Sequence, residues 1–228
     1  MAERSHRSTD RVDYKALNTL STVDLDLSLK GKKKYSRGSK IYLVERLISR
    51  RKANKEELEY LVKWKDWPLW SCTWEPSCHL NDHLIRTYDN PVITRERIQH
   101  GAALFLEAVL TILKSNAVKV SYSAEIRLDH DIVRYVFRGK GKQAADGVCM
   151  LYDKYDFIRF DLPEYWYYYL HELGQGIAID FPIKLKTVLS FVKKRYLVSN
   201  GQLKLAPNSP IEKVIIFVNR RACGCNNI

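Results

Sequence analysis

The chain has 228 residues, of which 46% are hydrophobic, and carries a formal net charge of +12 at pH 7. This hydrophobic content excludes a wholly disordered chain, and the charge favours polyanionic partners such as DNA or RNA. No stretch of about eighteen apolar residues is present, so we expect no membrane span. The polar start argues against secretion, and the five irregularly spaced cysteines indicate a reducing compartment rather than a disulfide framework.

The first 39 residues show little periodicity and are predicted to form a flexible basic arm. Residues 31–40, at its end, hold five positive charges, two glycines and no acidic residue. Three uses fit such a run: a solvated linker, a nuclear import signal, or neutralisation of nucleic-acid phosphates. The predicted nucleic-acid contacts are Lys32, Lys33, Lys34, Arg37 and Lys40.

Residues 41–88 contain four of the five tryptophans. Alternating patterns predict three antiparallel strands near 41–46, 60–65 and 72–75, and the spacing of apolar residues at 80–88 predicts a helix across them. Two interpretations of the aromatic residues are open. They form either a small β core or a surface that attracts a cation through its aromatic faces.

These residues closely resemble a chromodomain, through the sequences YLVER at 42–46, YLVKWKDWP at 60–68 and TWEP at 73–76. The resemblance implies that a cage of Tyr42, Trp64 and Trp67 binds a methylated lysine of a histone H3 tail, and that Trp74 belongs to the core. A tryptophan as third cage residue is more similar to the Polycomb branch than to the heterochromatin-protein branch. The implied peptide contacts are Val44, Ser71, Glu75, His79 and Asn81.

Several positions depart from the family pattern. Ser71 stands where many relatives have an acidic residue, and His79 and Asn81 stand where they commonly have Asn and Asp. Asp66 replaces the usual glycine in a turn, and Trp70 adds an aromatic residue near the mouth of the implied cage. Two interpretations therefore stay open for residues 40–90: a methyl-lysine reader, or a related fold that serves another partner.

Residues 91–228 resemble no family that we recognise. Apolar spacing predicts helices at 94–114 and 181–196, and alternation predicts strands at 118–122, 132–137, 148–152, 155–160, 202–205 and 214–218. We expect an α+β domain with helices packed on an antiparallel sheet, which makes the whole chain α+β, and we expect this domain to bind a protein partner or to self-associate. The basic face of the second helix is a candidate nucleic-acid surface, with ordinary solubility as the alternative, and consists of Lys184, Lys186, Lys193, Lys194 and Arg195.

Two short motifs of this region do not indicate ligand binding. The basic glycine turn at 138–142 lacks the ending of a phosphate-binding P-loop. The aromatic run at 165–169 fits a core better than a base-stacking surface.

The sequence contains no convincing catalytic constellation. His130 between Asp129 and Asp131 fits a base or a ligand, although a turn between strands explains all three, and Cys223-x-Cys225 lacks partners at zinc-ligand spacing. We therefore predict no catalytic residue, no metal and no cofactor, and interpret the chain as a nuclear chromatin adaptor. The alternatives are a structural interaction protein, such as one derived from a mobile element, or the non-catalytic N-terminal part of a chromatin-modifying enzyme.

Overall fold

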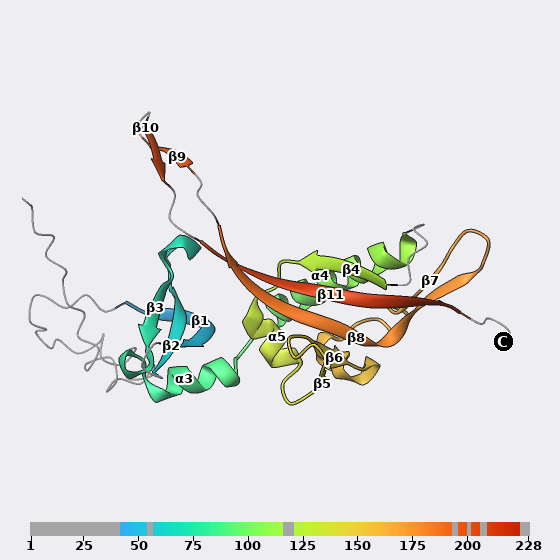
Figure 1. Ribbon diagram of the computed structural model, residues 1–228, viewed down its shortest axis with the longest axis horizontal. Coiled ribbons are helices and arrows are strands. Elements are labelled where there is room, and N and C mark those ends of the chain that lie inside the picture. Colours follow the sequence, from blue (N-terminus) through green and yellow to red (C-terminus); the bar gives the residue numbers. More distant parts are fainter. Residues whose placement is uncertain are drawn as a thin grey trace, which may run out of the picture. The chain divides into compact units, whose positions relative to one another are not determined.

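The computed structural model describes residues 42–53, 57–115, 121–192, 196–199, 202–205 and 209–223. The chain divides into two compact units, with the boundary between Tyr88 and Asp89 (Figure 1). The predicted arm at 1–39 and the five predicted nucleic-acid contacts up to Lys40 lie outside the described residues.

The first unit is a three-stranded antiparallel sheet that is followed by a helix. Its elements are β1 (Val44–Lys52), β2 (Leu58–Trp64), the 3-10 helix η1 (Leu69–Ser71), β3 (Thr73–Pro76), the 3-10 helix η2 (Ser77–His79) and α3 (Asp82–Asp89). Strand β2 lies between β1 and β3. Its alternation buries Tyr60 and Val62 in one cluster with Leu47 of β1 and Leu80. The predicted fold of this segment is confirmed.

Trp74 differs from its predicted place in the core. Its side chain is only partly buried and is not a member of the core cluster. The physical reason is its register, because Trp74 pairs with Leu61 and therefore lies on the opposite face of the sheet from Tyr60. There the guanidinium of Arg51 lies 4.1 Å from the centre of the Trp74 ring.

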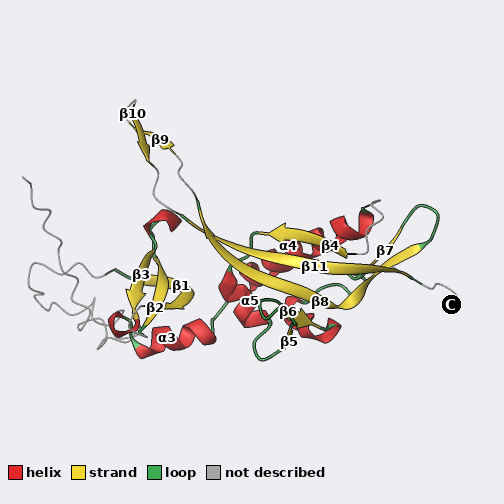
Figure 2. Ribbon diagram, viewed as in Figure 1, coloured by secondary structure: helices red, strands yellow, loops and turns green. Residues whose placement is uncertain are grey.

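The second unit is built on a six-stranded sheet in which all pairs are antiparallel (Figure 2). In spatial order the strands are β4 (Ser121–Ile126), β11 (Pro210–Ala222), β8 (Gly176–Phe191), β6 (Met150–Tyr152) and β5 (Lys142–Gln143), while β7 (Tyr168–Leu170) also pairs with β8. The helices are α4 (Arg95–Lys114), α5 (His130–Val136) and the 3-10 helix η3 (Lys154–Phe160). Strands β9 (Tyr196–Ser199) and β10 (Gln202–Leu205) form a separate hairpin.

Helix α4 supplies much of the core of this unit. Its buried side chains recur at three and four residues, and Phe105, Val109 and Leu113 have no exposed surface. They share one cluster with side chains of α5 and η3 and with Ile183 and Leu185 of β8. The predicted helix at 94–114 and the α+β class are confirmed. Neither α4 nor any other helix in the described ranges is long and apolar enough to cross a membrane.

The segment 181–196, predicted to be a helix, is mostly strand. Strand β8 extends to Phe191, and β9 begins at Tyr196. Ile183 and Leu185 are buried, whereas Lys184 and Lys186 alternate with them and are partly exposed. The prediction of a basic helix face is therefore wrong for the described residues of this segment. The apolar residues satisfy a period of two as well as one of 3.6, and pairing with β11 decides between them.

Two further segments, 132–137 and 155–160, were predicted to be strands but are helical. Ile132, Val133, Val136 and Phe137 are all buried, and their spacing of one, four and five places them on one side of a helix. Short apolar runs do not distinguish a strand from a buried helix by periodicity alone, and here packing against α4 and the sheet decides. The predicted strand at 118–122 overlaps β4 only from Ser121, since residues 118–120 lie outside the described ranges.

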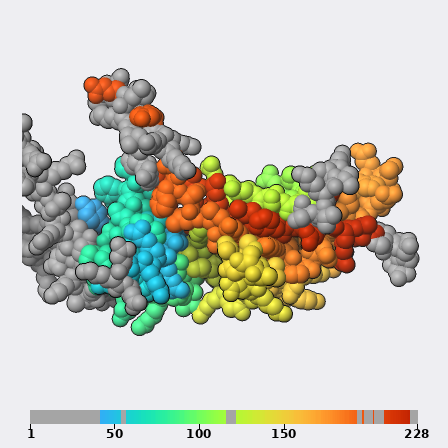
Figure 3. Space-filling model, in the orientation of Figure 1, coloured from blue at the N-terminus to red at the C-terminus, as the bar shows by residue number. Residues whose placement is uncertain are grey.

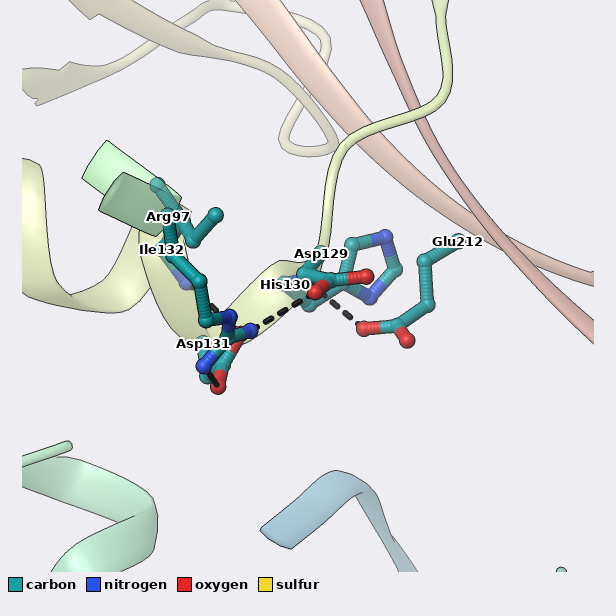
Figure 4. Close-up of polar contacts among 6 residues, drawn as sticks. All are labelled: Arg97, Asp129, His130, Asp131, Ile132 and Glu212. Atoms are coloured by element: carbon teal, nitrogen blue, oxygen red, sulfur yellow. Dashed lines mark hydrogen bonds and ion pairs between the residues drawn. The ribbon is translucent and has the colours of Figure 1, made fainter. Parts of the chain in front are cut away.

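A partly buried polar cluster holds the start of α5 in place (Figure 4). Asp129, His130 and Asp131, predicted to form a turn between strands, instead begin this helix. Arg97 of α4 donates to Asp131 at 2.8 and 2.9 Å and to Asp129 at 2.7 Å. Burial would lower the pKa of Arg97, but these hydrogen bonds and charges outweigh burial and raise the pKa. Glu212 of β11 accepts the backbone N–H of His130 at 2.7 Å, so the cluster links both helices to the sheet.

Candidate functional site

Three aromatic rings meet at one end of the first unit. Tyr42 lies just before β1, Trp64 is the last residue of β2, and Trp67 follows in the next turn. The ring centroid of Tyr42 lies 6.2 Å from that of Trp64 and 5.7 Å from that of Trp67, with interplanar angles of 65° and 75°. The structure therefore brings together the three side chains that the sequence predicted, and we call them the aromatic trio.

Backbone pairing sets the trio in place. Val44 pairs with Trp64 across β1 and β2, and the N–H of Lys65 donates to the carbonyl of Leu43 at 2.8 Å. These contacts place the residue before β1 next to the end of β2. The indole Nε1 of Trp64 also donates to Oγ1 of Thr73 in β3 at 3.1 Å, which orients the Trp64 ring.

Lys63, which the sequence reasoning did not select, holds the turn that carries both tryptophans. The residue is only 9% exposed. Its Nζ donates to the carbonyl oxygens of Trp64 and Trp67 at 2.8 and 2.6 Å and to Oε2 of Glu45 at 2.7 Å. An ammonium group has three N–H donors, so all three are used. The signal in the sequence was a lysine inside an apolar strand, because lysine is rarely buried unless it is paired.

The same turn contains a residue in the left-handed backbone region. Asp66 has a φ of +62°, a conformation that costs an L-residue roughly 1–2 kcal/mol and that glycine adopts freely. The N–H of Trp67 donates to the carbonyl of Trp64 at 3.3 Å across this turn. Glycine, the usual residue of the family at this position, would fit the observed backbone better than aspartate.

Replacing Asp66 with glycine should therefore stabilise the first unit by a few tenths to about 1 kcal/mol, since the relief of strain exceeds the extra freedom of glycine in the unfolded chain. Urea denaturation of the full chain measures this change. Asp66→Ala is the matched control, because it removes the same carboxylate but retains the strain. If the glycine variant is no more stable than the alanine variant, the turn is not strained.

Two predicted peptide contacts have local structural tasks. The hydroxyl of Ser71 donates to the carbonyl of Pro68 at 2.6 Å, which closes η1. Oδ1 of Asn81 accepts the backbone N–H of Leu84 at 2.6 Å and so caps the first turn of α3. Both side chains therefore stabilise the elements that flank β3.

The other predicted contacts lie on β3, η2 and β1. Glu75 accepts a hydrogen bond from Oγ1 of Thr73 at 2.6 Å, and its other oxygen lies 3.3 Å from Nδ1 of His79. Thr73 in turn receives the indole N–H of Trp64, so a chain of polar contacts runs from the aromatic trio to His79. Val44 is partly buried against the core cluster.

Large apolar side chains near the trio in the sequence are open to solvent. Trp67 is 46% exposed and Trp70 is 49% exposed, and Leu43 and Leu69 are also exposed. Exposed apolar groups that occur together mark interaction surfaces more often than scattered ones do. The segment that carries Trp67, Leu69 and Trp70 is therefore exposed and apolar.

The other candidate residues have structural roles where they are described. Nε2 of His130 lies 3.2 Å from the carbonyl oxygen of Lys213, and a carbonyl only accepts, so this nitrogen carries the proton. Across the described ranges, no group of three or more His, Cys, Asp or Glu side chains is arranged to hold a metal ion. Cys223 is partly buried, and Cys225 lies outside the described residues.

Residues 42–90 match the family model of the chromo (chromatin organisation modifier) domain. The matched range contains the aromatic trio, Lys63 and all five predicted peptide contacts. The family resemblance of this segment is confirmed, and the match ends close to the boundary between the two compact units.

Proposed function

We propose that this chain is a chromatin-associated adaptor whose chromo domain binds a methylated lysine of a histone H3 tail. The family match at residues 42–90 supports the association with chromatin. The observation that carries the methyl-lysine site is the aromatic trio, in which Tyr42 lies within 6.2 Å of Trp64 and 5.7 Å of Trp67.

The chemistry of such a ligand fits three aromatic rings. A methylated ammonium keeps its charge but loses N–H donors, so its desolvation leaves few or no hydrogen bonds unmade. Each aromatic face attracts the cation through its negative quadrupole, by about 0.5–1 kcal/mol at an exposed site and about 2 kcal/mol or more when desolvated. Lys63 holds the Trp64–Trp67 turn by its three hydrogen bonds, which lowers the cost of ordering the rings on binding.

The arrangement favours the trimethylated state. Ser71 stands where many relatives have an acidic residue, and its hydroxyl is bonded to Pro68. The carboxylate of Glu45 is engaged by Lys63, and that of Glu75 by Thr73 and His79. A lower methylation state gains most where a carboxylate can accept its remaining N–H, so we expect the trimethylammonium group to bind best here.

Tryptophan fluorescence of the full chain, titrated with H3-tail peptides, tests this proposal. We expect the trimethylated peptide to bind at least about 10-fold more tightly than the unmodified peptide. A peptide with a neutral tert-butyl isostere in place of the trimethylammonium group is the matched control, and it should bind more weakly because it lacks the charge. Equal affinities for all three peptides would show that the module serves another partner.

The remaining parts of the proposal extend this adaptor role. The five positive charges of residues 31–40 support added affinity for DNA or RNA and residence in the nucleus. The second unit, with its own core, supports a role as a platform for a protein partner or for self-association. The proposed adaptor acts by binding and has no catalytic step.

A further inference from the structure

A pocket of about 420 Å³ opens in the second unit beside the turn that follows α5. All of its lining residues belong to this unit, which begins at Asp89, the last residue of α3. Its lining includes the apolar side chains of Val133, Phe137, Met150 and Leu185, which we call its floor, and three cations, Arg134, Arg138 and Lys140. In Figure 3 the segment that follows this turn in the chain and contains η3 is yellow, and it lies at the surface beside the orange β8.

The basic turn that forms the rim is tightly built. Gly139 and Gly141 have φ values of +69° and +76°, in the region that favours glycine. A Cβ atom on Gly141 would lie 2.4 Å from the ring of Tyr152, so only glycine fits there. Tyr152 also stacks on Phe137, with ring centroids 4.2 Å apart. The turn is therefore held against the core, and it presents Arg138 and Lys140 at the pocket.

Lys140 has a neutral partner. Nζ of Lys140 donates to the backbone carbonyl of Asp156 at 2.8 Å, and Arg138 is exposed and forms no ion pair with any residue in the described ranges. Arg138 also lines a second hollow of about 210 Å³ together with Arg159, and Arg159 donates to the carbonyl of Tyr135. Backbone carbonyls orient cations without neutralising them, so the positive potential is available to an anion.

The formal charge of the pocket matches a dianion. Three cations line it and Asp89 adds one carboxylate, so three positive charges and one negative charge leave a formal +2. A phosphate monoester carries a charge of about −1.5 to −2 at neutral pH and offers three acceptor oxygens. The volume of about 420 Å³ lies in the range of small-molecule sites. Inorganic phosphate alone would gain no binding energy from the apolar floor.

We propose that this pocket binds a phosphate monoester attached to a flat apolar ring, of the size of a mononucleotide. The phosphate contacts Arg138 and Lys140, and the ring lies over the floor at Phe137 and Met150. This site is separate from the proposed methyl-lysine site and does not depend on it.

Isothermal titration calorimetry of the full chain with four probes tests the proposal. AMP and phenyl phosphate combine a phosphate with a ring, adenosine lacks the phosphate, and inorganic phosphate lacks the ring. We expect AMP and phenyl phosphate to bind at least about 10-fold more tightly than either partial probe, because the site uses both parts. A 5′-phosphorylated oligonucleotide that binds more tightly than AMP would identify the end of a nucleic-acid strand as the source of the nucleotide.

Three variants test whether AMP binds in this pocket. Arg138→Gln and Lys140→Gln should each weaken AMP at least about 10-fold. Lys142→Gln is the matched control, since Lys142, the first residue of β5, is an exposed cation that directly follows the turn and does not line the pocket. It should leave the affinity within about 2-fold. The proposal is overturned if AMP and phenyl phosphate do not bind, if phosphate alone binds as tightly, or if Lys142→Gln weakens binding as much as the rim variants do.

Discussion

Replacing Trp64 with alanine should weaken binding of the trimethylated H3 peptide by about 30-fold or more. A desolvated cation–π contact contributes about 2 kcal/mol, and each 1.4 kcal/mol corresponds to tenfold in affinity. The ring of Trp64 lies 6.2 Å from that of Tyr42, and the hydrogen bond from its indole N–H to Thr73 orients it. The same fluorescence titration, followed through the remaining tryptophans, measures the loss.

Trp64 also packs against the core of its unit, so its removal lowers stability as well as binding. Trp67→Ala separates the two effects, because Trp67 is 46% exposed and its truncation should weaken the peptide by a comparable factor without unfolding the sheet. Trp64→Phe retains an aromatic face and should recover part of the affinity. If both alanine variants fold and bind the peptide with unchanged affinity, the aromatic trio is not part of the binding site.

Replacing Phe105 with alanine should lower the free energy of unfolding of the second unit by about 3–5 kcal/mol. Its side chain has no exposed surface, and its ring lies 5.2 Å from Phe157, 5.8 Å from Phe160 and 5.9 Å from Trp166 by ring centroids. The loss is large because three rigid rings cannot collapse into the cavity without leaving their own contacts. Hydrogen exchange read by mass spectrometry measures the effect, since it follows each unit of the chain separately.

The matched control is Phe191→Ala, the same truncation at the end of β8, where the side chain is 40% exposed. It should cost less than about 1 kcal/mol. Because residues 42–88 form a unit with its own core, Phe105→Ala should also leave affinity for the H3 peptide unchanged. A comparable loss in both phenylalanine variants would mean that the cluster around Phe105 is not the centre of the core.

Helix α4 could be predicted from sequence because its pattern of apolar residues is long and fits only a helix. Over twenty residues, apolar positions that recur at three and four do not fit an extended strand. The aromatic trio could be predicted for a different reason. Its residues lie in sequence motifs of a known domain family, and the family carries the geometry that brings Tyr42 to the tryptophans.

Other parts could not be predicted because short patterns are degenerate. Ile183 and Leu185 fit a helix with Val188 and Leu189, and they also fit a strand, so pairing with β11 was needed to decide. The start of α5 is held by Arg97, which lies in α4 and donates to the two aspartates there. Contacts between residues so far apart leave no local pattern.

Local patterns and family motifs were thus sufficient to predict the chromo domain, the α+β class, helix α4 and the identity of the trio, because each depends on the spacing of neighbouring residues or on the motifs of a known domain family. Three features were decided only by tertiary contacts. Lys63 becomes the clamp of the Trp64–Trp67 turn because Glu45 and two carbonyls surround it. Trp74 lies outside the core cluster of Tyr60 because its strand register places it on the other face of the sheet. The basic glycine turn becomes the rim of a pocket because Tyr152 and Phe137 hold it against the core. In each case the free energy comes from burial or pairing between distant segments, which the order of residues along the chain does not display.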